Sequence, residues 1–293
     1  MRTPVVVSAT LALALALSPV ALESFGSATA SASSTTTAQQ CLAANKSSLY
    51  KSGQLTIATD SPAYTPWFVN NKPSNGQGYE SAVAYAVASQ LGFSAKNVKW
   101  TVEHFDNSYQ PGAKAFDFDV NEISYTSDRA QVVSFSNSYY DVTQSIIALK
   151  GSPIIKKHTP AELKTYIYGD QLGTTGLAYI NNYIKPTNAP HVYDTLADAV
   201  SALVAKQIQA LVIDTPDGQY MASPGSGEIP HNNGVQVGQF PSDGEYYGML
   251  FTKNNPLVGC VNDALSTLTS NGTLAALNKK WLGIYNKVPT IQP

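Results

Sequence analysis

The sequence predicts an α/β fold in which helices cover mixed or parallel sheets. Short strand-like and helix-like segments alternate through the body of the chain. Of the 293 residues, 43% are hydrophobic and 13% are charged, which allows a sizeable core and argues against a disordered chain. No motif recurs at a fixed period, so a repeat architecture is not expected.

Four segments define the first part of this fold. Residues 54–59 form a short apolar run that is typical of a strand, and residues 97–102 have the composition of a second strand. Residues 79–91 are predicted to be helical because valine and leucine recur every four positions with alanines beside them. Residues 116–124 alternate between apolar and polar side chains and lead into a turn.

The middle of the chain repeats this pattern. A strand near residues 166–169 is followed by a helix that Pro186 ends. Residues 196–205 have a helical pattern, and residues 208–213 form an apolar strand. A turn at Asn271-Gly272 precedes a last amphipathic helix.

We expect residues 1–32 to be a signal peptide that is cleaved near Ala30 or Ala32. A basic start is followed by an apolar run at 5–17 and then by small residues. The run is shorter than the roughly 20 residues that usually span a bilayer. Residues 33–40 are polar and are predicted to be a flexible tether. The mature protein should therefore work outside the cytoplasm, either secreted or in the cell envelope.

The charge and the motifs argue against several functional classes. A formal net charge of −2 gives no basic field for nucleic acid and no polybasic patch for a membrane surface. The sequence has no GxSxG, HExxH, GxxxxGK or GxGxxG motif, and its four histidines lack metal-ligand spacing. We therefore expect no catalytic residue, no metal and no cofactor.

The two cysteines, Cys41 and Cys260, allow three interpretations. Lipidation of Cys41 would need an apolar segment directly before it, and a catalytic thiol has no supporting context. A disulfide fits best, because an exported protein meets oxidising conditions. Such a bond would stabilise the fold by roughly 4–5 kcal/mol in the chain-entropy model. It would also bring the two ends of the chain together.

Polar side chains follow several of the predicted strands. They are Asp60, Ser124, Arg129, Thr174, Thr175 and Asp214. Taken singly, each is explained as a turn or helix-cap residue. Ligands of open α/β sheets bind at the carboxyl ends of strands, however, and an arginine can hold a carboxylate through two parallel hydrogen bonds. An opposing aspartate would accept hydrogen bonds from an ammonium group. Together these residues suit a zwitterionic amino acid.

Several motifs in consecutive order resemble family 3 extracellular solute-binding proteins. They are DSPAYTPW at 60–67, GYES at 78–81, ISYTSDRA at 123–130, VSFS at 133–136, GTT at 173–175, ALVID at 210–214, and NGT and KWL within 271–282. The resemblance covers about residues 50 to 285 and so includes nearly all of the mature body.

The resemblance implies a two-lobed class II periplasmic-binding-protein fold with two hinge crossings. Lobe 1 would hold residues 41–143 and 244–293, and lobe 2 would hold residues 144–243. The crossings would lie near residues 141–144 and 239–245. It also implies the extracytoplasmic substrate-binding component of an ABC importer, a monomer that captures a small amino acid (polar or basic) and delivers it to a membrane permease.

By this similarity, Arg129 would grip the ligand α-carboxylate, with help from Thr174 and Thr175. Asp214 would accept hydrogen bonds from the α-ammonium group, assisted by the region of Ser124. The lobes would close around the ligand by a hinge motion.

The remaining expected ligand residues are Asp60, Tyr64, Trp67 and Glu122. Tyr64 and Trp67 would form an apolar wall, with a plain core role as the alternative for Trp67. Glu122 stands where small or amide residues are frequent in the family. It would select a basic or hydroxyl-bearing side chain if it faces the cleft; otherwise it pairs with a protein cation or points to solvent.

Three alternatives compete with this function. Some relatives act as cyclohexadienyl or arogenate dehydratases on the same fold, and Glu122 or Asp60 could supply the acid or base that such chemistry needs. The ligand could instead be a zwitterion other than an amino acid. A ligand-sensing ectodomain is the third alternative, although the sequence shows no transmembrane helix or signalling domain.

Overall fold

The computed structural model describes residues 37–283 and 288–291. The predicted signal peptide and the first part of the predicted tether lie outside the described residues. Residues 37–40, which the prediction placed in the flexible tether, begin helix α1 (Ala38–Ala44): Thr37 caps this helix, and its Oγ1 accepts a hydrogen bond from the Gln40 amide at 3.2 Å. Within the described ranges, no helix is both long and apolar enough to cross a membrane.

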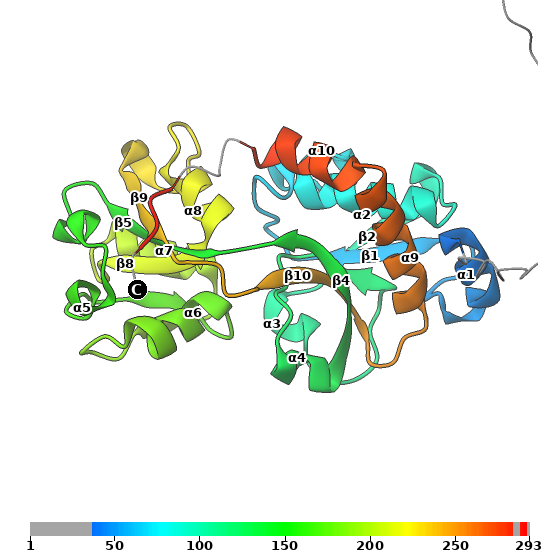
Figure 1. The fold of residues 1–293 in the computed structure, drawn as a ribbon, viewed down its shortest axis with the longest axis horizontal. Helices are drawn as coiled ribbons and strands as arrows, with labels where there is room; N and C mark the ends of the chain where they lie inside the picture. The colour runs from blue at the N-terminus through cyan, green and yellow to red at the C-terminus, as the bar shows by residue number, and fades with distance from the viewer. Residues whose placement is uncertain (1–36, 284–287, 292–293) are drawn as a thin grey trace, which may run out of the picture. The chain divides into compact units, whose positions relative to one another are not determined.

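The first sheet has five strands in the order β2-β1-β3-β10-β4 (Figure 1). The strands are β1 (Leu55–Thr59), β2 (Val98–Val102), β3 (Phe118–Asp119), β4 (Val133–Asp141) and β10 (Tyr246–Thr252). β1 pairs in parallel with β2 and β3, while β10 is antiparallel to β3 and β4. All five residues of β1 are buried, which agrees with its uninterrupted apolar run.

Three helices pack together beside this sheet and contribute to one hydrophobic core (Figure 1). They are α2 (Tyr79–Gln90), α9 (Leu257–Ser270) and α10 (Thr273–Trp281). The predicted four-residue spacing in α2 is confirmed, since Val83 and Val87 are buried in the core. The shorter helices α3 (Phe105–Ser108) and α4 (Ser127–Val132) follow β2 and β3 along the chain.

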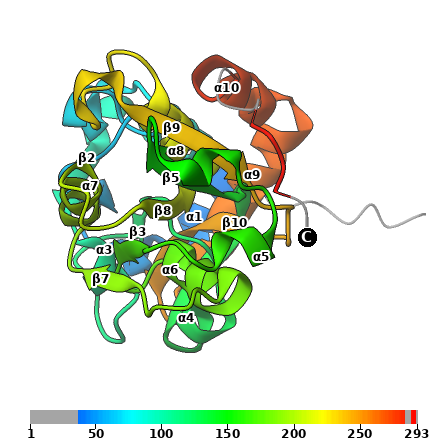
Figure 2. The same cartoon turned by 90° about the vertical axis from the view of Figure 1, so that its left-hand side faces the viewer.

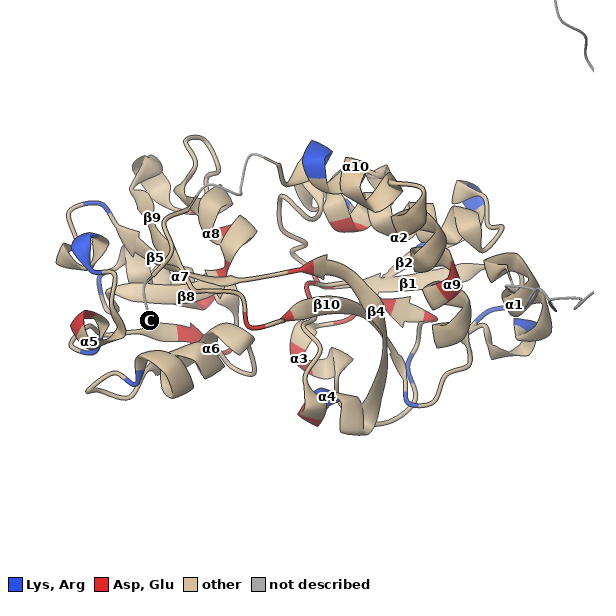
Figure 3. Cartoon of the chain, in the orientation of Figure 1, with Lys and Arg blue, Asp and Glu red and all other residues tan. Residues whose placement is uncertain are grey.

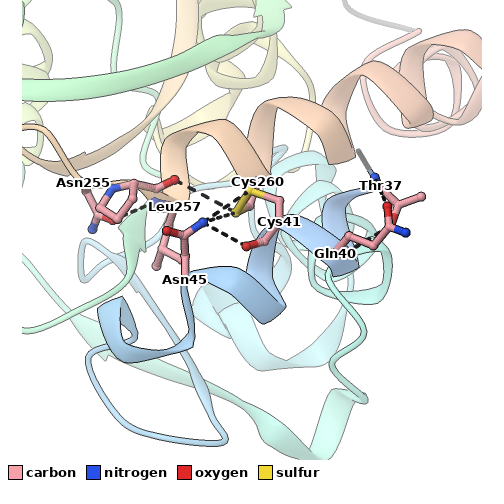
Figure 4. The surroundings of a disulfide bond; sticks show 8 residues. Thr37, Gln40, Cys41, Asn45, Asn255, Leu257 and Cys260 are labelled. Carbon is pink, nitrogen blue, oxygen red and sulfur yellow. Dashed lines mark hydrogen bonds between the residues drawn. A yellow bond between two sulfur atoms is a disulfide. The ribbon is translucent and has the colours of Figure 1, made fainter. Parts of the chain in front are cut away.

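The predicted disulfide between Cys41 and Cys260 is confirmed (Figure 4). It joins α1 to α9, with an S–S distance of 2.01 Å and a Cα–Cα distance of 5.1 Å. Asn45 donates a hydrogen bond from Nδ2 to the Cys41 carbonyl oxygen at 2.9 Å, which helps to end α1 beside the bond. The bridge therefore ties the start of the described chain to the first sheet and its helices.

The second group of strands contains a three-stranded antiparallel sheet in the order β8-β5-β9 and a parallel pair, β6-β7. The strands are β5 (Gln144–Leu149), β6 (Gly169–Gln171), β7 (His191–Tyr193), β8 (Ala210–Asp214) and β9 (Gly234–Gln239). An isolated bridge from Tyr168 to Ala210 connects the pair to the sheet.

β5 is buried on both faces. Ile146 and Ala148 belong to one hydrophobic cluster, and Ile147 and Leu149 belong to another, as the two-residue period of a strand requires. The covering helices are α5 (Pro160–Leu163), α6 (Thr175–Tyr179), α7 (Leu196–Val204) and α8 (Thr215–Ala222). α6 continues as a π-helix over Ile180–Ile184 and ends just before Pro186, as predicted.

The chain passes twice between the two groups of strands (Figures 1 and 2). It leaves the first sheet after Asp141 and enters β5 at Gln144. It returns between Gln239, at the end of β9, and Tyr246, at the start of β10.

The last described residues differ from the expectation that the tail belongs with the first lobe. Residues 288–291 run beside β9 of the second group: Gln239 donates from its amide to the Pro289 carbonyl oxygen at 2.8 Å, and Ile291 donates back to the Gln239 carbonyl at 2.7 Å. The Ile291 side chain is fully buried in the cluster that contains Ile146. The disulfide therefore does not place residues 288–291 beside α1, because this part of the tail packs on the other group of strands.

Candidate ligand-binding site

A cavity of about 90 Å³ is bounded by residues from both groups of strands. It lies where strands β1, β3 and β8 end, at the carboxyl edges at which α/β proteins bind ligands. Eight of the nine expected ligand residues line this cavity. They are Asp60, Tyr64, Glu122, Ser124, Arg129, Thr174, Thr175 and Asp214.

Arg129 connects the two sides of the cavity. Its side chain starts from α4, where the Thr126 hydroxyl accepts a hydrogen bond from the Arg129 amide at 3.1 Å and caps the helix. The guanidinium donates from Nη1 to the Ser124 carbonyl oxygen at 2.7 Å and from Nη2 to the Gly173 carbonyl oxygen at 2.9 Å. The residue is 7% exposed, so this cation is held in a fixed position between the two parts of the molecule.

Two aromatic rings also hold the guanidinium. Its central carbon lies 4.6 Å from the ring centre of Tyr109 and 5.2 Å from that of Phe105, which are cation–π distances. Burial lowers the pKa of Arg129, and the neighbouring Tyr109 opposes that change. An arginine stays charged in proteins. The free-energy cost of removing this charge from water must therefore be offset by the groups that surround the guanidinium.

The two threonines of the GTT motif have different partners. Thr174 is the N-cap of α6: its Oγ1 accepts from the Leu177 amide at 3.1 Å and donates to the Gln171 carbonyl oxygen at 2.9 Å. The Thr175 hydroxyl instead accepts a hydrogen bond from Gln144 Nε2 at 3.1 Å. Thr174 is therefore committed to capping, while Thr175 belongs to the polar network of the cavity.

Asp214 ends β8 and precedes α8, as its position after an apolar strand predicts. Gln144 donates from Nε2 to Asp214 Oδ1. Burial, reinforced by the negative charge of Glu245, raises the pKa of Asp214 to about 7, although Arg129 acts in the opposite direction. Asp214 is thus a half-buried acceptor that lines the same cavity as Arg129.

Glu122 and Asp217 extend this acidic region. One carboxylate oxygen from each of Glu122, Asp214 and Asp217 lies within 4.8 Å of the other two. Burial raises the pKa values of Glu122 and Asp217 well above the usual range, and the charges of neighbouring carboxylates add to the effect. Histidine does not contribute to this cluster.

A local backbone constraint places Glu122 in the cavity wall. Its φ of 54° lies in the left-handed region, which is uncommon for residues other than glycine. The buried Glu80 carboxylate holds this conformation, because its Oε1 accepts a hydrogen bond from the Glu122 amide at 2.7 Å. Tyr139 donates its hydroxyl proton to the same oxygen. The structure thus places Glu122 at the cavity rather than against a protein cation.

Asp60 and Tyr64 also line the cavity. Asp60 Oδ1 lies 3.0 Å from Nδ1 of the exposed His104, and its Oδ2 accepts from the Phe105 amide at 3.2 Å. Burial raises the pKa of Tyr64 to about 12, so the hydroxyl keeps its proton. Asp60 therefore has a structural role at the start of α3 in addition to lining the cavity.

Trp67 does not line the cavity, which corrects its expected place in the binding wall. Its side chain has no exposed area and packs edge-to-face against Tyr79, Tyr140 and Tyr247. The indole Nε1 donates to Asp217 Oδ1 at 2.8 Å. Trp67 thus belongs to the hydrophobic core, as its alternative interpretation stated, and it positions one carboxylate of the acidic cluster.

Several residues of the site were missed by the sequence analysis. The cavity is also lined by Phe105, Asn121 and Gln144, and Asp217 and Glu245 adjoin its polar groups. Gln144 begins β5, directly after the first crossing. A polar residue at this predicted hinge position could have indicated that Gln144 belongs to the site. Asp217 lies three residues after Asp214 within a helix, and nothing in the local pattern distinguished it from a surface acid.

The fold and the shared cavity define a class II, two-lobed solute-binding protein of the α/β type. Bacterial extracellular solute-binding proteins, family 3, match residues 55–284, and the chain belongs to this family.

Similar proteins bind several amino acids, according to their names. A lysine/arginine/ornithine-binding periplasmic protein of Escherichia coli is 26% identical over 234 residues, covering 77% of this chain and 86% of the relative. An L-cystine-binding protein of Bacillus subtilis is 26% identical over 242 residues, covering 80% and 84%. A mutant of ArgBP from T. maritima has a similar structure, with a TM-score of 0.65, 25% identity and coverage of 83% of this chain and 99% of that chain.

Proposed function

We propose that this protein captures a small amino acid outside the cytoplasm and delivers it to the membrane permease of an ABC importer. One observation carries the proposal: a buried guanidinium from α4, beside the first sheet, and a half-buried carboxylate at the end of β8 line the same cavity. A zwitterion needs an anion partner and a cation partner at short range, and Arg129 and Asp214 supply both. The names of the curated relatives support amino acids as the ligand class.

Each lining residue has a role in this proposal. Arg129 uses one N–H on each terminal nitrogen for backbone carbonyls, so each of these nitrogens keeps a second N–H for the ligand α-carboxylate. Thr175 assists at the same end. Asp214 accepts from the α-ammonium group, with Ser124 beside it. Asp60 and Tyr64 border the ligand side chain.

Binding is proposed to stabilise the closed arrangement of the two lobes. Arg129 reaches across to Gly173 in the second group of strands, so the residue that grips the carboxylate also contacts the opposite side. A ligand held by both sides has a higher affinity for the closed form and shifts the population toward it. The permease would then recognise that closed form. We propose that the protein acts as a monomer.

The route out of the cytoplasm follows from the N-terminal sequence. We propose that residues 1–32 direct export and are removed near Ala30 or Ala32. Membership of an extracellular family supports this location.

We propose binding rather than catalysis as the activity. One observation favours the alternative of a dehydratase: carboxyl groups that line a cavity and have raised pKa values, as Asp214 and Glu122 do, are typical of general acids. Incubating the protein with arogenate or prephenate at mildly alkaline pH tests that alternative, because an enzyme forms the decarboxylated aromatic product faster than a protein-free control does.

The binding function is tested by a thermal-shift screen against the common amino acids and zwitterionic osmolytes, followed by calorimetry. A ligand at 100 times its Kd stabilises the folded state by about 2.7 kcal/mol, which gives a clear rise in Tm. We expect at least one amino acid to bind with one-to-one stoichiometry. If only osmolytes bind, the ligand class is a zwitterion other than an amino acid. If neither amino acids nor osmolytes bind, the proposal is refuted.

A further inference from the structure

A buried hydrogen bond joins the two groups of strands outside the lining of the ligand cavity. Trp67 belongs to the hydrophobic core of the first sheet, and Asp217 lies on α8, which packs on β5, β8 and β9 of the second group. The indole Nε1 donates to Asp217 Oδ1 at 2.8 Å, and the two residues are 0% and 3% exposed. Separation of the two groups would break this bond and expose both side chains to water.

Asp217 also contacts an acid of the first group. Its Oδ2 finds no N–H donor within the described ranges, yet Asp217 shares a hydrogen bond with Glu122, the residue that the Glu80 carboxylate holds in the cavity wall. Two ionised carboxylates cannot form such a bond, because each is an acceptor only. One proton on Glu122 supplies the donor, and Asp217 then accepts from Glu122 and from Trp67.

The surroundings of Glu122 and Asp217 favour a proton on this acid pair. Besides burial, the charges of Glu80 and Asp214 raise the pKa values of both residues. Figure 3 shows that acidic positions predominate around the strands that connect the two groups. The guanidinium of Arg129 interacts with Asp214. The titratable groups that face the pair are acids and tyrosines: Glu80 of α2, Asp214 of β8, Tyr139 and Tyr140 of β4, Tyr247 of β10, and Tyr64.

We propose that Glu122 and Asp217 share one proton when the two groups of strands close, so that capture of the ligand is linked to uptake of a proton from the solvent. This inference rests on the proposed function, because ligand binding is what stabilises the closed arrangement. In an open arrangement the two carboxyl groups would separate and contact water. Solvated carboxyl groups have pKa values of about 4 and are ionised near neutral pH. Closure brings them together again, and the pair then takes up its proton.

The proton makes affinity depend on pH in one direction. Because the pKa of the pair is higher in the closed form than in the open form, its contribution to affinity is complete below the open-form pKa and is lost as the pH rises through the closed-form pKa. Uptake of one proton weakens binding by up to about tenfold for each pH unit. Asp214 acts in the opposite direction, because a bound α-ammonium group lowers its pKa from about 7. A comparison with matched variants therefore isolates the pair.

Calorimetry in two buffers counts the protons. The mature protein is titrated near pH 6.5, in phosphate and in imidazole, with the common amino acid that gives the largest thermal shift. The difference in apparent binding enthalpy, divided by the difference in buffer ionisation enthalpy, is the number of protons taken up. Glu122→Gln and Asp217→Asn each replace the shared proton by a permanent amide N–H that keeps the hydrogen bond. Each variant should take up about one proton fewer than wild type.

The pH profile of Kd gives a second readout, which a merely structural role would not change. From near pH 6 to near pH 8, the affinity of each variant relative to wild type should rise about tenfold, because the wild-type pair alone loses its proton. Impaired folding does not produce a relative gain at high pH. Circular dichroism without ligand verifies that each variant is folded.

Asp119→Asn is the matched control. Asp119 is fully buried and does not line the cavity. Burial raises the pKa of Asp119 well above its usual range, and the acids that add to the effect, Glu80, Glu103 and Asp60, all belong to the first group. Closure therefore leaves the surroundings of Asp119 unchanged, and this control should take up as many protons as wild type.

The outcomes are distinct. Equal proton numbers in wild type and in both variants of the pair would overturn the shared proton and leave the proposed function intact. A decrease of the same size in Asp119→Asn would also overturn it, because any buried acid would then have the same effect. A pH dependence that disappears in EDTA would assign the acidic residues to a metal ion instead. Absence of binding by every amino acid and zwitterionic osmolyte would end both proposals.

Discussion

Replacing Arg129 by alanine removes the one guanidinium that both lines the cavity and contacts its two sides. In the wild-type protein this side chain is 7% exposed and donates to the carbonyl oxygens of Ser124 and Gly173. A ligand carboxylate bound in the Arg129→Ala protein would be desolvated without its cationic partner. Truncating one member of such a buried pair costs about 2–5 kcal/mol. The expected loss is therefore about 30-fold to several thousand-fold in Kd.

A lysine at the same position distinguishes the effect of the positive charge from the effect of the hydrogen-bond geometry of the guanidinium. Arg129→Lys keeps the positive charge but cannot donate in parallel to a carboxylate and to both backbone carbonyls. We expect its affinity to lie between those of wild type and Arg129→Ala. Isothermal titration calorimetry with the ligand found by the screen measures all three proteins, and the thermal midpoint without ligand reports their folding.

Two results would refute the reasoning about Arg129. Undiminished affinity in Arg129→Ala would remove this residue from the site. Equal loss in Arg129→Ala and in a variant that only destabilises the fold to the same extent would mean that the arginine acts through structure alone. Leu265→Ala supplies this second protein, because Leu265 is buried in the core of the first sheet and does not line the cavity.

Three further predictions concern stability. Replacing Cys41 and Cys260 together by serine should lower the unfolding free energy by about 5 kcal/mol, the chain-entropy value for a separation of 219 residues; a change below 1 kcal/mol in chemical denaturation would contradict this. Burial raises the folded-state pKa values of Asp214 and Glu80 to about 7, so the folded state binds more protons than the unfolded state at mildly acidic pH. The ligand-free protein should therefore be more stable near pH 5 than near pH 8, with each unit of pKa difference contributing about 1.4 kcal/mol. An unfolding free energy, measured by chemical denaturation, that increases from pH 5 to pH 8 would contradict this prediction. Ile291→Ala should cost about 2–5 kcal/mol because the side chain is fully buried, and a cost within error of zero would show that the tail is not anchored.

Much of the fold could be predicted because local periodicity survives in the sequence. The apolar runs that became β1 and β8 each end at a polar residue, and the rule that ligands bind at carboxyl ends of strands was enough to bring Asp60 and Asp214 to one cavity. The family resemblance supplied what periodicity cannot, namely the two crossings and the pairing of distant segments.

Other features depend on tertiary contacts that a linear pattern does not contain. Trp67 lies near Tyr64 in the same motif, yet Gly78 approaches so closely that an added Cβ would meet the Trp67 carbonyl oxygen at 2.2 Å, and the indole is enclosed in the core. Asp217 is distinguished from a surface acid by tertiary features alone, namely its burial, its hydrogen bond from Trp67 and its position beside Glu122 and Asp214. The position of the tail depends on the buried side chain of Ile291 and on backbone hydrogen bonds with Gln239.

The path of the tail has a practical consequence for measuring motion in this protein. Thr37 begins a helix that is covalently bridged to α9, whereas Thr290 pairs with Gln239 on the opposite group of strands. Fluorophores attached at Thr37 and Thr290 would report energy transfer between the two halves while leaving the solute cavity untouched. Thr37 and Thr290, close to the limits of the described residues, thus offer a pair of reporter positions on opposite halves, with no need to insert a reporter into a loop.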